Sequence, residues 1–172
     1  LEALVADFET QVEMAQGRSI HSVFIGGGTP SLISAQGYQW LFGQLKARLD
    51  FKADCEITLE ANPGTVEHDP FADYLAVGIN RLSLGVQSFD PEHLQRLGRI
   101  HSANNALDAI QQARQAGFER VNVDLMHGLP QQTEEQALTD LKLAVEQGAT
   151  HISWYQLTIE PNTVFFRTQP VL

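Results

Sequence analysis

Short apolar segments alternate with amphipathic helical segments along the chain, and this order constrains the fold more than any other feature. Five segments are predicted as strands, at residues 23–25, 56–60, 81–86, 121–125 and 152–157. Helices are predicted around them, at residues 1–17, 34–49, 71–77, 90–98, 102–117 and 133–148. Because strands separated by helices pair in parallel, this order predicts a parallel sheet with helical crossovers.

The predicted strands have one apolar face and one polar face. In the third strand Leu82, Leu84 and Val86 share one face, whereas Ser83 and Gln87 lie on the other. The second and fourth strands alternate in the same way. Strands of a doubly wound sheet are covered by helices on both faces and are apolar throughout. We therefore predict an α/β barrel whose helices lie outside and whose polar inner face holds a ligand.

Composition and charge exclude several classes of protein. Hydrophobic residues make up 43% of the 172 residues, enough to bury the core of one domain. The 11 basic and 21 acidic residues leave a net charge of −10, which disfavours nucleic acid as a partner and gives no indication of membrane association. Cys55 is the single cysteine, so an intrachain disulfide is impossible and a reducing, cytoplasmic setting is expected.

Polar groups or bare backbone stand at the carboxyl end of each predicted strand, where parallel α/β folds bind their ligands. These positions are Gly26 to Gly28 with Thr29 and Pro30, then Glu60, Gln87, Asp124 and Thr158. The side chain of Thr158 cannot be oriented, because the adjacent Trp154 and Tyr155 break the alternation of the fifth strand. A ring of such groups suits a polar, zwitterionic ligand that is held by many hydrogen bonds.

The triple glycine has four possible readings. It is not a phosphate-binding loop, since no Gly-Lys-Ser/Thr follows, and Ser31 stands where the dinucleotide fingerprint needs its last glycine. A tight turn would need only one glycine. Three in succession favour a ligand that lies against bare backbone and uses its N–H and C=O groups.

Glu60 and Asp124 are solvated strand ends in the plainest interpretation, but as a pair flanking Gln87 they favour a binding site. Carboxylates accept hydrogen bonds from an amino group or a ribose diol. Arg99 is either an ordinary surface arginine or a clamp for a ligand carboxylate. The six histidines show no zinc spacing, and His127 is either partly buried in the core or turned toward the rim.

Strings in these positions match the motifs of one protein family, in order and with its spacing. They are Gly26-Gly27-Gly28-Thr29-Pro30-Ser31, Glu60-Ala61-Asn62-Pro63, Arg81-Leu82-Ser83-Leu84-Gly85-Val86-Gln87-Ser88-Phe89, Asn122-Val123-Asp124-Leu125 and Gly128-Leu129-Pro130-Gln131-Gln132-Thr133. They resemble the oxygen-independent coproporphyrinogen III oxidase family of radical S-adenosylmethionine proteins. Ser88 and the string Leu157-Thr158-Ile159-Glu160-Pro161-Asn162-Thr163 are more similar to its heme chaperone branch.

The resemblance implies a partial TIM-like barrel of six βα units, of which residues 1–172 form a core fragment with about five strands. It implies that S-adenosylmethionine binds beside a [4Fe-4S] cluster. The implied cofactor contacts are Gly27, Gly28, Thr29, Glu60, Gln87, Arg99, Asp124 and Thr158. The cysteines that hold the cluster are expected upstream of Leu1, and a further domain is expected downstream. Because the chain has one cysteine, no radical chemistry is expected from it alone.

The two branches of the family imply different functions. In the chaperone branch the protein binds heme and passes it to an acceptor protein, so heme or a porphyrin is the expected partner. In the oxidase branch a 5′-deoxyadenosyl radical drives oxidative decarboxylation of coproporphyrinogen III. An alternative outside the family is a metal- or phosphate-dependent barrel enzyme that uses Glu60 and Asp124.

Overall fold

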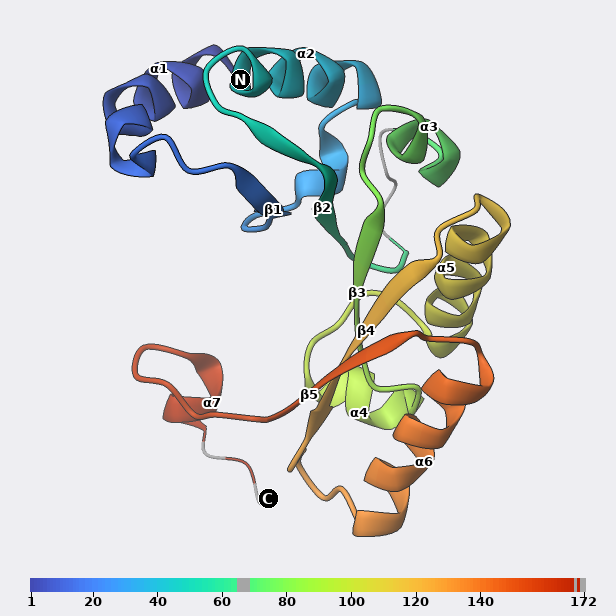
Figure 1. Ribbon diagram of the computed structural model, residues 1–172. Coiled ribbons are helices and arrows are strands. Elements are labelled where there is room, and N and C mark those ends of the chain that lie inside the picture. Colours follow the sequence, from blue (N-terminus) through green and yellow to red (C-terminus); the bar gives the residue numbers. More distant parts are fainter. Residues whose placement is uncertain (65–68, 169, 171–172) are drawn as a thin grey trace.

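A computed structural model describes residues 1–64, 69–168 and 170. One parallel sheet runs through it in the order β1-β2-β3-β4-β5 (Figure 1). The strands are β1 (Ile20–Ile25), β2 (Phe51–Ala61), β3 (Arg81–Gln87), β4 (Arg120–His127) and β5 (His151–Gln156). The α-helices are α1 (Glu2–Gln11), α2 (Ala35–Lys46), α3 (Phe71–Ala76), α4 (Pro91–Arg96), α5 (Ala103–Gln115), α6 (Glu134–Glu146) and α7 (Val164–Arg167). Two short 3₁₀ helices are η1 (Val12–Ala15) and η2 (Pro30–Leu32).

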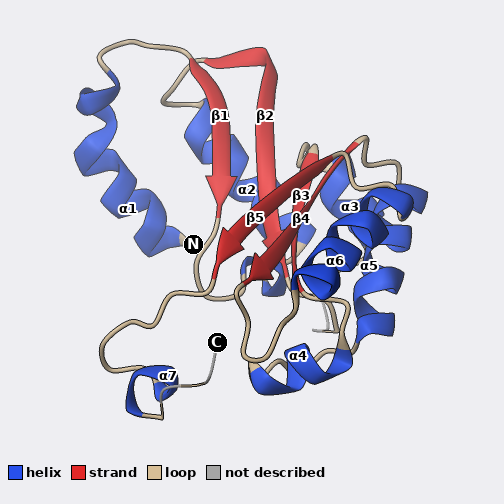
Figure 2. Ribbon diagram, turned by 90° about the horizontal axis from the view of Figure 1, so that it is seen from below, coloured by secondary structure: helices blue, strands red, loops and turns tan. Residues whose placement is uncertain are grey.

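The sheet curls into a half-barrel. Helices α3, α5 and α6 lie together along one side of it, away from α7 (Figure 1). Strands β4 and β5 run obliquely to β1 and β2, as the right-handed twist of a sheet requires (Figure 2). The prediction of a partial α/β barrel with five parallel strands and outer helices is therefore confirmed.

The helices begin where their capping residues predict. The side chain of Ser34 accepts the backbone N–H of Gly37 at the start of α2. Ser102 with Asn105, and Thr133 with Gln136, close capping boxes at the starts of α5 and α6. These contacts satisfy N–H groups that have no partner inside the helix, and so they fix the point at which each crossover leaves its strand.

The core lies between the sheet and the outer helices. Side chains on the outer face of β3 and β4 are fully buried there, namely Leu82, Leu84, Val86, Val121, Val123 and Leu125. Helix α5 meets them with Ala106, Ile110 and Ala113, whose small or branched side chains let the helix pack closely. Burial of this apolar face is the main favourable contribution to folding and orients every strand with its polar face inward.

The inner face of the sheet is polar, as the alternation predicts. Near the amino ends of the strands, Glu56 pairs with Arg81 at 3.6 Å and with Arg120 at 3.3 Å. Further along, the side-chain amide of Asn122 donates to the hydroxyl oxygen of Ser83 at 2.9 Å, and its carbonyl oxygen accepts the hydroxyl of Ser153 at 3.2 Å. Ion pairs and hydrogen bonds thus fill the lower part of the half-barrel and leave the carboxyl ends of the strands for a site.

The main differences from the sequence prediction lie in four elements. Strand β1 begins at Ile20 rather than residue 23. Strand β2 begins at Phe51 rather than residue 56, because Phe51 pairs with Ile20 of β1. A shift in the pairing register separates this pair from the rest of the strand, and the pattern of apolar residues does not reveal such a shift. The first helix changes to the 3₁₀ helix η1 at Val12, where the periodicity alone predicted a continuous helix. Helix α7 is a single turn that Thr163 caps, and it is too short for a periodic pattern.

Candidate functional site

A cavity of about 170 Å³ opens at the carboxyl ends of the strands. Its walls combine backbone from the glycine turn with polar side chains from β2 to β5. They are Gly28, Pro30, Glu60, Ala61, Asn62, Ser83, Gly85, Gln87, Asp124 and Tyr155. The structure therefore brings Gly28, Glu60, Gln87 and Asp124, which the sequence separates by up to a hundred residues, around one space.

The glycine turn after β1 forms one wall with bare backbone. The N–H of Gly27 donates to Oε2 of Glu60 at 3.2 Å. Gly27 and Gly28 have φ angles of 86° and 55°, which residues with a side chain rarely adopt. A Cβ at either position would point into open space. A ligand can thus lie against the backbone of Gly27 and Gly28, beside a carboxylate that is already oriented.

Two buried tyrosines hold this turn from behind. The hydroxyl of Tyr38 donates to the carbonyl of Pro30 at 2.7 Å. The single hydrogen of the Tyr74 hydroxyl is shared between the carbonyls of Ser31 at 2.7 Å and Ile33 at 2.9 Å. Burial raises the pKa of Tyr38, and the neighbouring Tyr74 raises it further. The hydroxyl of Tyr38 therefore remains a donor. The segment that follows the glycine turn is thus fixed by two side chains that do not line the cavity.

Asp124 lines the cavity from β4 and lies in a hydrogen-bonded network. Its Oδ2 accepts the hydroxyl of Ser83 at 3.0 Å, and its Oδ1 accepts the side-chain amide of Asn122 at 2.8 Å. Two fixed donors hold the carboxylate in one orientation while it lines the cavity. The oxygens that remain available can accept hydrogen bonds from a ligand without rearrangement.

Gln87 projects into the cavity from the end of β3, where its backbone has a φ of 69°. The hydroxyl of Tyr155 donates to Oε1 of Gln87 at 2.6 Å and so links β3 to β5. Burial is the main cause that raises the pKa of Tyr155, followed by the charge of Asp124, so the hydroxyl remains a donor. Gly85 makes room for this arrangement, since a Cβ there would lie 3.1 Å from Nε2 of Gln87 and 2.9 Å from Oδ1 of Asn62.

Four other predicted contact residues do not line the cavity. Gly27 reaches it through its bond to Glu60, and Thr29 is the residue that precedes η2. Arg99 is exposed, and its charge lowers the pKa of Tyr155. Thr158 is exposed beyond the end of β5. The cofactor roles of these residues remain predictions.

The structure settles the orientation of the fifth strand. Tyr155 faces inward to Gln87, whereas the adjacent Trp154 faces outward, with its ring centroid 4.6 Å from that of His127. His127 thus points away from the cavity. Of the two interpretations that the sequence left open for His127, the structure favours packing rather than binding.

The predicted contact residues did not include six that line the cavity, namely Pro30, Ala61, Asn62, Ser83, Gly85 and Tyr155. Ser83 and Gly85 share the strand face of Gln87, and Asn62 follows Glu60 by two positions, so the period of two could have identified them. Tyr155 gave no such signal, because its strand is an exposed edge of the sheet with apolar and aromatic residues on both faces.

The polar groups around the cavity suit S-adenosylmethionine as a ligand, but they do not suit an iron–sulfur cluster. Carboxylates, an amide and bare backbone suit an amino-acid and nucleoside ligand, and a fold open at one rim can admit it. Among the described residues, no group of three or more His, Cys, Asp or Glu is arranged to hold a metal ion. The cluster needs several thiolates, and this chain has one cysteine.

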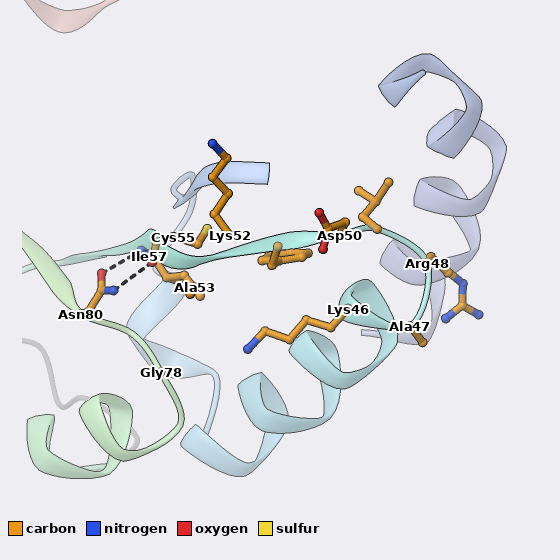
Figure 3. Close-up of a pocket in the computed structure, with 12 residues that line it drawn as sticks. Lys46, Ala47, Arg48, Asp50, Lys52, Ala53, Cys55, Ile57, Gly78 and Asn80 are labelled. Carbon is orange, nitrogen blue, oxygen red and sulfur yellow. Dashed lines mark hydrogen bonds between the residues drawn. The ribbon is translucent and has the colours of Figure 1, made fainter. Parts of the chain in front are cut away.

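Cys55 is remote from the cavity and has a structural setting. It borders a hollow of about 860 Å³ beside the first half of β2, where Asn80 replaces the missing strand partner (Figure 3). The side chain of Asn80 accepts the N–H of Ile57 at 2.8 Å and donates to the carbonyl of Cys55 at 2.9 Å. Burial is the main cause that raises the pKa of the thiol, as expected of an inert cysteine.

No helix in the described part of the chain is long and apolar enough to cross a membrane. The predicted cytoplasmic location stays a prediction.

Comparisons with known proteins agree with the geometry. Over all 172 residues the chain is 53% identical to the heme chaperone HemW of Haemophilus influenzae and 54% identical to that of Escherichia coli, and it spans 45% and 46% of their lengths. The solved structure of coproporphyrinogen III oxidase (HemN) from Escherichia coli matches with a TM-score of 0.82 and 30% identity, over 99% of this chain and 39% of that one. The model of the radical SAM superfamily matches residues 3–144. The chain belongs to the radical SAM superfamily.

Proposed function

We propose that this chain is the S-adenosylmethionine-binding barrel of a HemW-like heme chaperone that acts in heme trafficking. The observation that carries the proposal is the shared cavity of Glu60, Gln87 and Asp124 beside the bare glycine turn. Membership of the radical SAM superfamily supports S-adenosylmethionine as the ligand of this cavity. Identity of 53% to 54% with HemW over the whole chain, against 30% with HemN, supports the chaperone over the oxidase.

Each residue of the cavity is assigned a contact with S-adenosylmethionine that its functional group can make. Glu60 and Asp124 accept hydrogen bonds from the ligand's amino group and ribose diol. Gln87 presents its amide from β3, while Gly27 and Gly28 offer backbone groups where side chains would intrude. Further contacts come from Arg99, Thr29 and Thr158 at the rim, with Arg99 suited to a ligand carboxylate.

The [4Fe-4S] cluster belongs, in this proposal, to a segment outside the chain. Together with S-adenosylmethionine it supplies one-electron chemistry when bound, and the chain's own residues orient the nucleoside ligand. The chain spans less than half the length of the HemW relatives, so it is proposed as a barrel core within a longer protein. Replacing Cys55 with Ser in the complete protein should leave its iron content unchanged, and iron loss would contradict this assignment.

The proposed partners are heme and an acceptor protein. The test incubates the complete, cluster-loaded protein with heme and, separately, with coproporphyrinogen III under anaerobic reduction. The chaperone proposal predicts a heme absorption spectrum that changes on binding and coproporphyrinogen III that is recovered intact. Formation of protoporphyrinogen would refute it.

The oxidase is the second candidate, because the fold matches HemN with a TM-score of 0.82. Turnover of coproporphyrinogen III that needs S-adenosylmethionine would establish it. Membership of the radical SAM superfamily excludes the third alternative, an unrelated metal- or phosphate-dependent barrel enzyme.

A further inference from the structure

We infer that Asp140 is a positioning residue for the S-adenosylmethionine site: from helix α6 it holds the turn that aims Gln87 into the cavity. The inference deepens the proposed function and rests on it, because Gln87 belongs to the same cavity. Asp140 itself lies behind the strand end and does not line that cavity.

The turn at Gln87 has an unfavourable backbone conformation. Its φ of 69° lies in the left-handed region, and the N–H of Ser88 donates to the carbonyl of Val86 at 2.9 Å across it. A three-residue turn of this kind with positive φ is rare and strained, and it persists only when its surroundings hold it. Gln87 is 4% exposed, so the turn is held by protein contacts rather than by water.

Asp140 supplies such contacts on one side of the turn. Its Oδ2 accepts the hydroxyl of Ser88 at 2.7 Å, and its Oδ1 accepts the backbone N–H of Phe89 at 2.9 Å. The hydroxyl oxygen of Ser88 in turn accepts the N–H of Asp90 at 3.0 Å. One carboxylate therefore fixes the residues that immediately follow Gln87.

His101 supplies the contact on the other side. Its Nε2 lies 3.0 Å from the carbonyl of Val86, the same oxygen that accepts the N–H of Ser88. The turn is thus held both before and after Gln87. From this turn, the side chain of Gln87 reaches the hydroxyl of Tyr155, which donates to its Oε1 at 2.6 Å.

The burial of Asp140 argues for a specific task. Its side chain is 3% exposed, and burial is the main cause that raises the pKa of the carboxyl, while the bonds from Phe89 and Ser88 oppose the rise. Burying a carboxyl group is unfavourable, and packing alone would be served better by an apolar residue. What this carboxylate adds is two directional hydrogen bonds to the backbone and side chain next to Gln87.

The test measures S-adenosylmethionine affinity by calorimetry in the complete, cluster-loaded protein, at a temperature where circular dichroism shows each variant folded. Asp140→Ala should weaken binding by about tenfold, which corresponds to about 1.4 kcal/mol. Asp140→Asn should lose less, because its Oδ1 can still accept the N–H of Phe89. Asp108→Ala is the matched control, since Asp108 is exposed on α5, and it should bind as the wild type does.

A second readout does not depend on the ligand. Hydrogen exchange of the peptide that contains Ser88 and Phe89 should accelerate in Asp140→Ala, less in Asp140→Asn and not in Asp108→Ala. If Asp140→Ala does not fold, the Asn variant decides, with faster exchange and weaker binding than the wild type expected. Unchanged affinity in a folded variant would overturn the inference. Failure of the wild type to bind S-adenosylmethionine would refute the proposed function instead, and exchange would still report on the turn.

Discussion

The carboxylate of Glu60 occupies the space that a side chain at Gly26 would need. A Cβ at Gly26 would lie 2.9 Å from Oε2 and 3.1 Å from Oε1 of Glu60. The φ angle of Gly26 is not positive, so its backbone conformation does not require glycine. The close approach of the Glu60 carboxylate does. The first residue of the glycine turn thus makes room for the carboxylate, and the next two leave space beside it.

Gly26→Ala should therefore disturb binding more than folding. The added methyl group meets the end of a flexible side chain, so Glu60 can rotate away, but its bond from the N–H of Gly27 is then lost. We expect S-adenosylmethionine affinity in the complete protein to fall about tenfold, the loss of one charge-assisted hydrogen bond, by calorimetry.

A matched glycine provides the control. Gly43 is exposed in α2, and a Cβ there meets nothing within 4 Å. Gly43→Ala should leave affinity unchanged and raise the free energy of unfolding by about 1 kcal/mol, the usual gain in helix propensity. Equal affinity in the Gly26 and Gly43 variants would contradict the role given to the close approach.

Tyr155→Phe tests the link between β5 and β3. The hydroxyl donates to Gln87 at 2.6 Å, and its removal should lower the free energy of unfolding by about 1 kcal/mol, the usual net contribution of one hydrogen bond. Urea unfolding of Tyr155→Phe, Gln87→Leu and the double variant gives the coupling between the two side chains. Additive effects would show that the bond contributes nothing, whereas we predict a coupling of at least about 0.5 kcal/mol.

Much of the fold could be predicted from local patterns. The period of two in β3 and β4 identified the buried face, because Leu82, Leu84 and Val123 are buried on one side while Ser83 and Asp124 face inward. The starts of α5 and α6 were predictable because capping is a contact between residues close in sequence. The edge strand β5 could not be oriented, since it lacks a neighbour whose burial would impose an alternation.

The candidate site was predictable as a set of residues but not as a geometry. Parallel strands end at the same rim, which is why Glu60, Gln87 and Asp124 could be grouped from sequence alone. The contacts that orient them come from distant elements, such as Tyr155 on β5 and Asp140 on α6. Such long-range hydrogen bonds have no local signature.

His101 makes stability depend on pH. Desolvation is the main cause that lowers its pKa below the ordinary 6.5, and the charge of Arg99 lowers it further, against the opposing bond to the carbonyl of Val86. The folded state thus favours the neutral ring. Its contribution to stability is complete above the unfolded pKa of about 6.5 and is lost as pH falls through the lower folded pKa.

Urea unfolding at about pH 7.5 and about pH 5, on either side of the ordinary histidine pKa, measures this term. The wild type should lose more stability toward acid than His101→Gln, whose amide does not titrate and can still donate to Val86. Identical pH profiles for the two proteins would show that the ring does not titrate with folding.

The central claim is that the polar groups at the strand ends bind one ligand. Isothermal titration of S-adenosylmethionine into the complete, cluster-loaded protein tests it directly, with the Glu60→Gln and Asp124→Asn variants and Glu119→Gln on the exposed surface as control. We predict that both site variants bind about ten- to a hundredfold more weakly, the loss expected for charge-assisted hydrogen bonds, while the control binds as the wild type does. Wild-type affinity in both site variants would contradict the account.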